Sequence, residues 1–146
     1  MRVLFCLLLF TGPIAAQDVF DIEITAACME EANSYEERQY CVGASTRRCS
    51  EHLEDPIMAV MCAKSETIWW EAQIATLVQT ISRSAETNEA QAKALARMQA
   101  DWLRYRDNSC AFEQAFGAGQ AAPEVDCLLW MTGDQAVYLF EYAPGY

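Results

Sequence analysis

The spacing of apolar residues predicts helices along most of the chain and almost no strand. A first helix is predicted from about Asp21 to about Thr46, in a stretch rich in Ala and Glu. A second is predicted from Ile57 to about Ser84, after Asp55-Pro56, because proline disfavours the helical conformation at the residue before it. Its apolar residues recur at the intervals of a helix face: Ile57, Met61, Ile68, Ala75, Val78 and Ile81.

Two further helices are predicted in the second half of the chain. The third begins after an N-cap at Thr87, with Asn88 as the alternative, and ends at Gly117 and Gly119. After a loop, a short apolar helix runs from Cys127 to about Tyr142. Steps of three and four residues in the third helix predict a stripe that faces the core: Leu95, Met98, Trp102, Tyr105, Ser109, Phe112 and Phe116. The pattern therefore predicts an all-α antiparallel bundle of about four helices.

The N-terminal segment has the pattern of a signal peptide. Arg2 is followed by a short apolar run, residues 3–10, and by small residues that end at Ala16. We expect cleavage near Ala16, which leaves residues 17–146 as a single domain. The apolar run is too short to span a bilayer, and no later stretch is long and apolar enough. The sequence therefore predicts an exported protein, periplasmic or secreted, without a membrane anchor.

The cysteines predict a disulfide framework. Seven are present, and removal of the signal peptide, which contains Cys6, leaves six. An even number in a small exported domain indicates disulfides, here three. Cys110 and Cys127 flank the loop between the third and fourth predicted helices, so we expect them to pair. A loop of this size corresponds to about 3 kcal/mol of stabilisation on the chain-entropy account.

The remaining four cysteines allow three pairings among Cys28, Cys41, Cys49 and Cys62. Within one continuous helix, Cys28 and Cys41 would lie about 20 Å apart, too far for a disulfide unless the helix breaks. A nested arrangement of Cys28–Cys62 with Cys41–Cys49 is favoured, and the combination of Cys28–Cys49 with Cys41–Cys62 stays open.

Charge and composition narrow the classes of function. With 21 acidic and 10 basic residues the net charge is −11, which argues against nucleic acid and anionic lipid and is compatible with a basic protein partner. The only histidine, His52, lies in a polar linker, and no Cys-x-x-Cys pair supports a zinc site. We find neither a nucleophile with an adjacent base nor a phosphate-binding loop. We therefore expect no enzyme activity, no cofactor and no metal.

Charged residues in the third predicted helix have definite positions around its axis. Arg106 and Glu113 border the predicted buried face, whereas Arg104 and Asp107 point to solvent. Because a charge at the border of a core needs a partner, Arg106 is expected to bridge two helices. The partners available in the sequence are Glu113, Asp134 and Gln135.

Two stretches resemble a known family. The stretch WLRYRDNSC-x-FE, followed after a Gly-containing loop by CLLWMT-x-x-QA, resembles the lysozyme inhibitor LprI family of exported bacterial helical domains. The resemblance runs from Met98 to Leu139, and the region upstream looks like a cysteine-rich variant of the same domain. The matching residues are Trp102, Tyr105, Arg106, Asp107, Cys110, Glu113, Cys127, Leu128 and Thr132. The chain departs from the family pattern at Ile74, Ala75, Val78 and Gln135.

The resemblance implies an inhibitor of a basic c-type lysozyme that acts by protein–protein contact. The loop from Gly117 to Asp126 is the predicted contact, and its candidate residues are Gln120, Pro123, Glu124 and Asp126. Trp69 and Trp70 are candidate anchors, because adjacent helical residues cannot both face one core and an exposed tryptophan is a frequent binding residue. The alternative is a structural or interaction domain of the cell envelope with another partner and no lysozyme inhibition.

Overall fold

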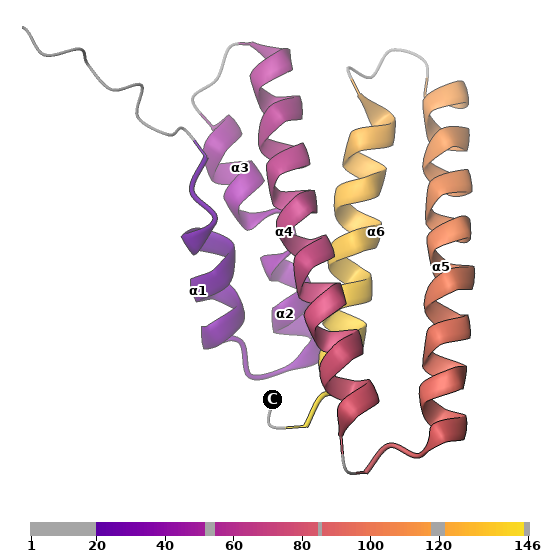
Figure 1. The fold of residues 1–146 in the computed structure, drawn as a ribbon. Helices are drawn as coiled ribbons and strands as arrows, with labels where there is room; N and C mark the ends of the chain where they lie inside the picture. The colour runs from indigo at the N-terminus through magenta and orange to yellow at the C-terminus, as the bar shows by residue number, and fades with distance from the viewer. Residues whose placement is uncertain (1–19, 52–54, 85, 118–121, 145–146) are drawn as a thin grey trace, which may run out of the picture.

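The computed structural model describes residues 20–51, 55–84, 86–117 and 122–144, and this part of the chain forms six α-helices (Figure 1). The all-α prediction is confirmed. The predicted number of about four helices is wrong, because the first predicted helix is three short ones. The helices are α1 Glu23–Glu31, α2 Tyr35–Cys41, α3 Ala44–Ser50, α4 Pro56–Arg83, α5 Glu89–Phe116 and α6 Pro123–Phe140.

Two local signals divide the first predicted helix. Ser34 has an extended backbone and caps α2, since its hydroxyl accepts a hydrogen bond from the Glu37 backbone N–H at 3.1 Å. The Glu37 carboxylate in turn accepts from the Asn33 backbone N–H at 2.6 Å. Gly43, with φ of 78°, separates α2 from α3 in the left-handed region that favours glycine. These signals end α1 and α2 and divide the predicted helix into three.

The two long helices begin where the sequence predicts. Asp55 caps α4 by accepting from the Ile57 backbone N–H at 2.9 Å, and Pro56 occupies the first helical position. Asn88 caps α5, so the alternative to Thr87 is the correct N-cap. Its side chain forms a capping box with Gln91, in which each side chain accepts from the other residue's backbone N–H.

Helix α6 lies between α4 and α5 (Figure 1). Of the three short helices, α3 packs against α4, α2 packs against α6, and α1 packs against α2 and α3. Helix α5 runs antiparallel to both of its long neighbours. Most of the core comes from α4 and α6, whereas α5 adds half-buried side chains at its inner edge. The buried apolar side chains of α4 and α6 are Cys62, Ala63, Trp70, Ile74, Leu77, Ile81, Leu129, Ala136, Val137 and Leu139.

The inward faces of α4 and α5 differ from the predicted ones. On α4, Ile57, Met61 and Ile68 are exposed, and the buried row is the one that contains Trp70 and Ile74. On α5 the predicted stripe holds only as far as Trp102, because Tyr105, Phe112 and Phe116 are exposed. The row that continues inward is Arg106 and Cys110. Trp102 belongs to both rows at helical spacing, so the period alone could not choose between them.

The disulfides correct the predicted pairing in the first half of the chain. Cys28 pairs with Cys41 and Cys49 with Cys62, so the nested arrangement is wrong. The break between α1 and α2 is the reason, because it brings the Cα atoms of Cys28 and Cys41 to 5.6 Å. Cys110 and Cys127 are joined as the sequence led us to expect, with Cα atoms 5.4 Å apart.

None of the helices in the described ranges is long and apolar enough to cross a membrane. The predicted signal peptide, residues 1–16, lies outside the described residues.

Candidate protein-binding surface

Arg106 is a buried charged residue between the three longest helices. Only 8% of the residue is exposed, and its guanidinium donates to Glu71 of α4 at 2.9 Å and to Thr132 of α6 at 3.2 Å. It also donates to Asp107 at 2.9 Å and lies 5.2 Å from the centre of the Trp102 ring. Arg106 thus bridges three helices, and the residues of the family motif around it hold the bundle together.

The partners predicted for Arg106 are wrong. Glu113 is exposed on the outside of α5, and Asp134 is exposed on α6. Gln135 is buried, but its amide donates to the Gln99 side chain of α5 at 2.5 Å. Arg104 and Asp107 are solvated as predicted. The spacing of residues in the sequence identified Arg106 as a bridge between helices. Its acceptor Glu71 could not be identified in this way, because the contact depends on how α4 lies beside α5.

A second polar cluster, around Glu66, was missed by the sequence analysis. This glutamate of α4 is fully buried. One carboxylate oxygen accepts from the Thr25 hydroxyl at 2.9 Å, the Gly43 backbone N–H at 2.8 Å and the Trp70 indole at 3.2 Å. The other accepts from the Thr46 backbone N–H at 2.7 Å. Glu66 therefore caps α3 and ties the three short helices to α4.

The predicted contact residues are only partly available to a partner. Gln120 lies outside the described residues, and Pro123 is buried at the first position of α6. Glu124 is half-buried and Asp126 is exposed in the first turn of α6. Trp70 is buried with its indole bonded to Glu66, whereas Trp69 is half-buried against it. Pro123 and Trp70 are therefore unsuitable as contact residues.

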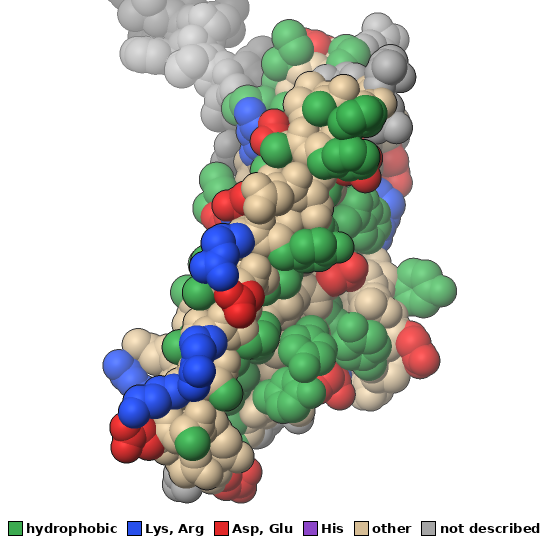
Figure 2. Space-filling model, turned by 90° about the vertical axis from the view of Figure 1, so that its right-hand side faces the viewer, with side chains coloured by type: hydrophobic (Ala, Val, Ile, Leu, Met, Phe, Trp, Pro, Cys, Tyr) green, Lys and Arg blue, Asp and Glu red, His purple; other side chains and the backbone are tan. Residues whose placement is uncertain are grey.

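Exposed aromatic side chains instead gather on one side of α5 and α6. Figure 2 shows hydrophobic side chains in a band along this side of the molecule, beside a row of Lys and Arg. We call this surface the aromatic face and define it by six exposed residues: Tyr105, Phe112, Phe116, Trp130, Tyr138 and Tyr142. Exposed apolar groups of this extent on a small domain indicate a binding surface.

On the aromatic face, the surface around Tyr105 of α5 is continuous with the surface around Tyr138 and Tyr142. A shallow hollow that contains Tyr105 and the pocket that contains Tyr138 and Tyr142 share the α5 residues Ala94 and Met98. The Phe112 and Phe116 rings stack with their centres 4.5 Å apart, and 72% of Phe116 is exposed. Because the Phe112–Phe116 pair lies on α5, its backbone is already ordered before a partner binds.

Acidic groups accompany the aromatic face. Asp134 lines a hollow with Trp130 and Tyr40. Although the residue as a whole is exposed, partial desolvation of its carboxyl by these neighbours raises the pKa above the ordinary value of 3.8. A hydrogen bond with Tyr142 raises the pKa of Tyr138 above its ordinary value. Within the described ranges no three His, Cys, Asp or Glu residues are placed to hold a metal ion.

The fold and this surface define a disulfide-stapled helical domain with an exposed aromatic face. The family model described as lysozyme inhibitor LprI matches residues 49–139, well over half of the chain, and the protein belongs to this family. The match covers α4, α5 and nearly all of α6. It contains Arg106 with its partners on α4 and α6, and five of the six residues of the aromatic face.

The chain is also similar to an uncharacterised 17.7 kDa protein of the puhA 5′ region of Rhodobacter capsulatus. The two are 29% identical over 140 residues, which cover 83% of this chain and 85% of that protein. No solved structure matches the chain. The similarity to the R. capsulatus protein extends beyond the family match, so the two proteins share more than the α4–α6 region.

Proposed function

We propose that the protein is exported and inhibits a lysozyme by protein–protein contact through the aromatic face. Membership of the lysozyme inhibitor LprI family supports the partner class. The exposed aromatic residues of α5 and α6 are the observation that carries the choice of surface. The net charge of −11 favours encounter with a strongly basic enzyme.

The composition of the aromatic face favours a high affinity for a protein partner. Tyrosine and tryptophan are enriched among the residues that dominate interface energies, and this face contains Tyr105, Trp130, Tyr138 and Tyr142. The face is held by the core contacts of α6 and by the Cys110–Cys127 disulfide. Its end at Phe116 adjoins the loop that the sequence analysis predicted as the contact, so the proposed surface extends that prediction along the bundle.

The proposal is tested by calorimetric titration of the oxidised protein with a c-type lysozyme at physiological salt, with muramidase activity followed in parallel. We expect one-to-one binding and loss of activity. Replacing a central aromatic residue, Phe112→Ser, should weaken binding at least about tenfold, or about 1.4 kcal/mol. The matched control is Ile68→Ser on α4, an exposed apolar residue (67%) outside the aromatic face. Its affinity should equal that of the unmodified protein.

Absence of binding would refute the lysozyme partner. Binding that does not inhibit and that moderate salt abolishes would also refute it, because such binding reflects only attraction between opposite charges. Equal losses for Phe112→Ser and Ile68→Ser would refute the choice of surface.

We further propose that residues 1–16 are removed on export and that residues 17–146 form one domain. Expression of the full chain in a Gram-negative host should give a periplasmic protein whose N-terminal residue is Gln17, measured by intact mass. A product that retains Met1 and stays with the cytoplasmic fraction would refute this proposal.

A further inference from the structure

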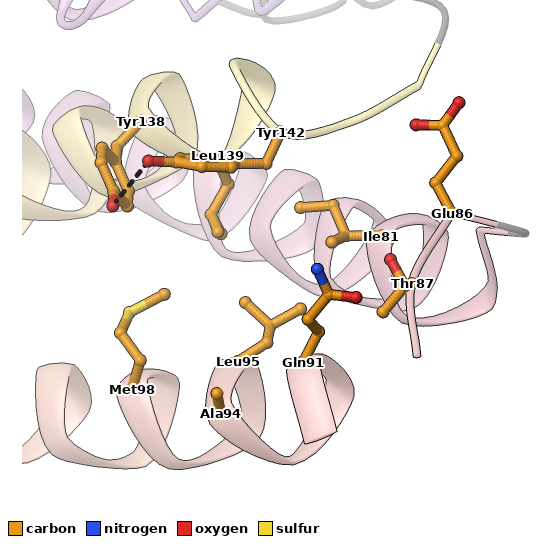
Figure 3. A pocket seen from close by; sticks show the side chains of 10 residues that line it. All are labelled: Ile81, Glu86, Thr87, Gln91, Ala94, Leu95, Met98, Tyr138, Leu139 and Tyr142. Atoms are coloured by element: carbon orange, nitrogen blue, oxygen red, sulfur yellow. Dashed lines mark hydrogen bonds between the residues drawn. The ribbon is translucent and has the colours of Figure 1, made fainter. Parts of the chain in front are cut away.

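A pocket of about 510 Å³ lies between the end of α4, the first half of α5 and the end of α6 (Figure 3). Its floor is apolar and is formed by Ile81, Leu95, Met98 and Leu139. This volume falls in the range of pockets that bind small molecules or a single protruding side chain. The pocket is therefore large enough to take an alkyl chain out of water.

The polar groups of the pocket are acidic or neutral. Figure 3 shows Tyr138 and Tyr142 on the α6 wall, opposite Leu95 and Met98, and Glu86 at the far end. The two tyrosine hydroxyls lie 3.1 Å apart and bond to each other. The other polar lining residues are Thr87 and Gln91, and none of the lining residues is Lys, Arg or His.

The Glu86 carboxylate is available for a ligand. The residue is exposed, and its backbone N–H donates to Ser84. Its carboxylate makes no hydrogen bond or ion pair with the residues that the structure describes. A charged group that lacks a partner at the end of an apolar pocket favours a ligand of opposite charge.

These features select the chemistry of the ligand. The apolar floor suits an unbranched alkyl chain. A long charged side chain can bury its own alkyl stem on such a floor while its charged end stays near water. Glu86 and the net charge of −11 oppose an anionic head. A cationic head is favoured by the Glu86 carboxylate at the end of the pocket.

We propose that this pocket binds a primary alkylammonium group, presented as the side chain of a surface lysine of the partner protein. The inference rests on the proposed function, because Tyr138 and Tyr142 belong to the aromatic face. It adds a specific receptor site: the lysine stem packs on Leu95 and Met98, and its ammonium group meets Glu86.

The site is tested first without any protein partner, by NMR titration of the oxidised protein with hexylammonium, hexanol and hexanoate. The methyl signals of Ile81, Leu95, Met98 and Leu139 report binding in the pocket. We expect hexylammonium to bind at least about fivefold more tightly than hexanol, and hexanoate to bind most weakly. In Glu86→Gln the ammonium should bind no better than the alcohol, while hexanol binding is unchanged.

Two alanine substitutions on α5 separate the pocket from the rest of the surface. Ala94 is exposed and lines the pocket, so Ala94→Phe should fill it and abolish the methyl shifts. Ala96 is also exposed but does not line the pocket, so Ala96→Phe should leave them unchanged. Equal binding of the three ligands, or shifts that persist in Ala94→Phe, would overturn the proposal.

The same variants connect the pocket to lysozyme. We expect Ala94→Phe and Glu86→Gln to weaken lysozyme binding at least about fivefold, and Ala96→Phe to leave it unchanged. Lysozyme binding that survives Ala94→Phe would overturn the lysine site and leave the proposed function standing. If the unmodified protein selects hexylammonium but does not bind lysozyme, the lysozyme function fails, and the pocket's ligand preference stands for another basic partner.

Discussion

Replacement of Glu66 by glutamine tests how the short helices are attached to α4. The carboxylate accepts four hydrogen bonds, from Thr25, Gly43, Thr46 and Trp70. A glutamine has the same shape, but only one of its two terminal atoms is an acceptor. When the amide oxygen keeps the bonds from Thr25, Gly43 and Trp70, the amide nitrogen faces the Thr46 backbone N–H. That backbone donor then has no acceptor.

The magnitude follows from the number of donors left without an acceptor. Each such buried donor costs about 1–3 kcal/mol, so Glu66→Gln should lose about 1–3 kcal/mol of unfolding free energy. Glu66→Ala removes the acceptor of all four donors and opens a cavity, so it should lose at least about 4 kcal/mol. The second value approaches the whole stability of a small domain, about 5–15 kcal/mol.

Urea unfolding of the oxidised protein, followed by far-UV circular dichroism, measures these losses. With a typical urea dependence of about 2 kcal/mol per M, Glu66→Gln should lower the midpoint by roughly 0.5–1.5 M. The control Glu113→Gln, at an exposed site on α5, should change stability by less than about 0.5 kcal/mol. A Glu66→Gln variant as stable as the unmodified protein, or more stable, would contradict the reasoning. The cost of burying the charge would then exceed the value of its hydrogen bonds.

Two further substitutions test packing and titration. A Cβ added at Gly133 would lie 2.3 Å from a Val42 methyl, so Gly133→Ala should lower the free energy of unfolding by about 1–3 kcal/mol. Adding Val42→Ala to this variant should recover part of the loss, because it removes the methyl groups that clash. If urea unfolding shows that the losses of the two substitutions simply add, the contact is contradicted. Because the pKa of Asp134 is raised in the folded state, ionisation of this carboxyl lowers the free energy of unfolding. This loss of stability is absent below pH 3.8 and develops as pH rises through the folded pKa. Asp134→Asn should therefore be slightly more stable than the unmodified protein at pH 7 and equal to it at pH 3, and a gain that persists at pH 3 would exclude titration as its cause.

Local signals in the sequence located the long helices well. Asp55-Pro56 and Asn88 begin α4 and α5 because capping depends on residues within one helical turn. The same kind of signal, at Ser34 and Gly43, marks the breaks around α2 that the prediction passed over. The family motif around Arg106 was also readable, since it consists of residue types at fixed spacing.

The candidate surface could not be read in the same way. Tyr105, Phe112 and Phe116 were predicted to face the core because they continue the apolar spacing of Trp102. In the fold, Cys110 must meet Cys127 and Arg106 must meet Thr132, and both contacts turn that stripe outward. Hydrophobicity shows which side chains gain free energy when they leave water. It does not show which of two apolar rows on a helix a neighbouring helix will cover.

By itself, the sequence determined the helical class, the starts of α4 and α5, the Cys110–Cys127 pair and the family. The start of α6 was wrong, because this helix begins at Pro123 and not at the predicted Cys127. The tertiary structure alone decided the pairing of the first four cysteines, the acceptors of Arg106, the buried role of Glu66 and the exposure of the aromatic face. Helix starts and caps depend on neighbours in the chain. Pairing, burial and surface depend on how α4, α5 and α6 are rotated against one another, which only the contacts among them settle.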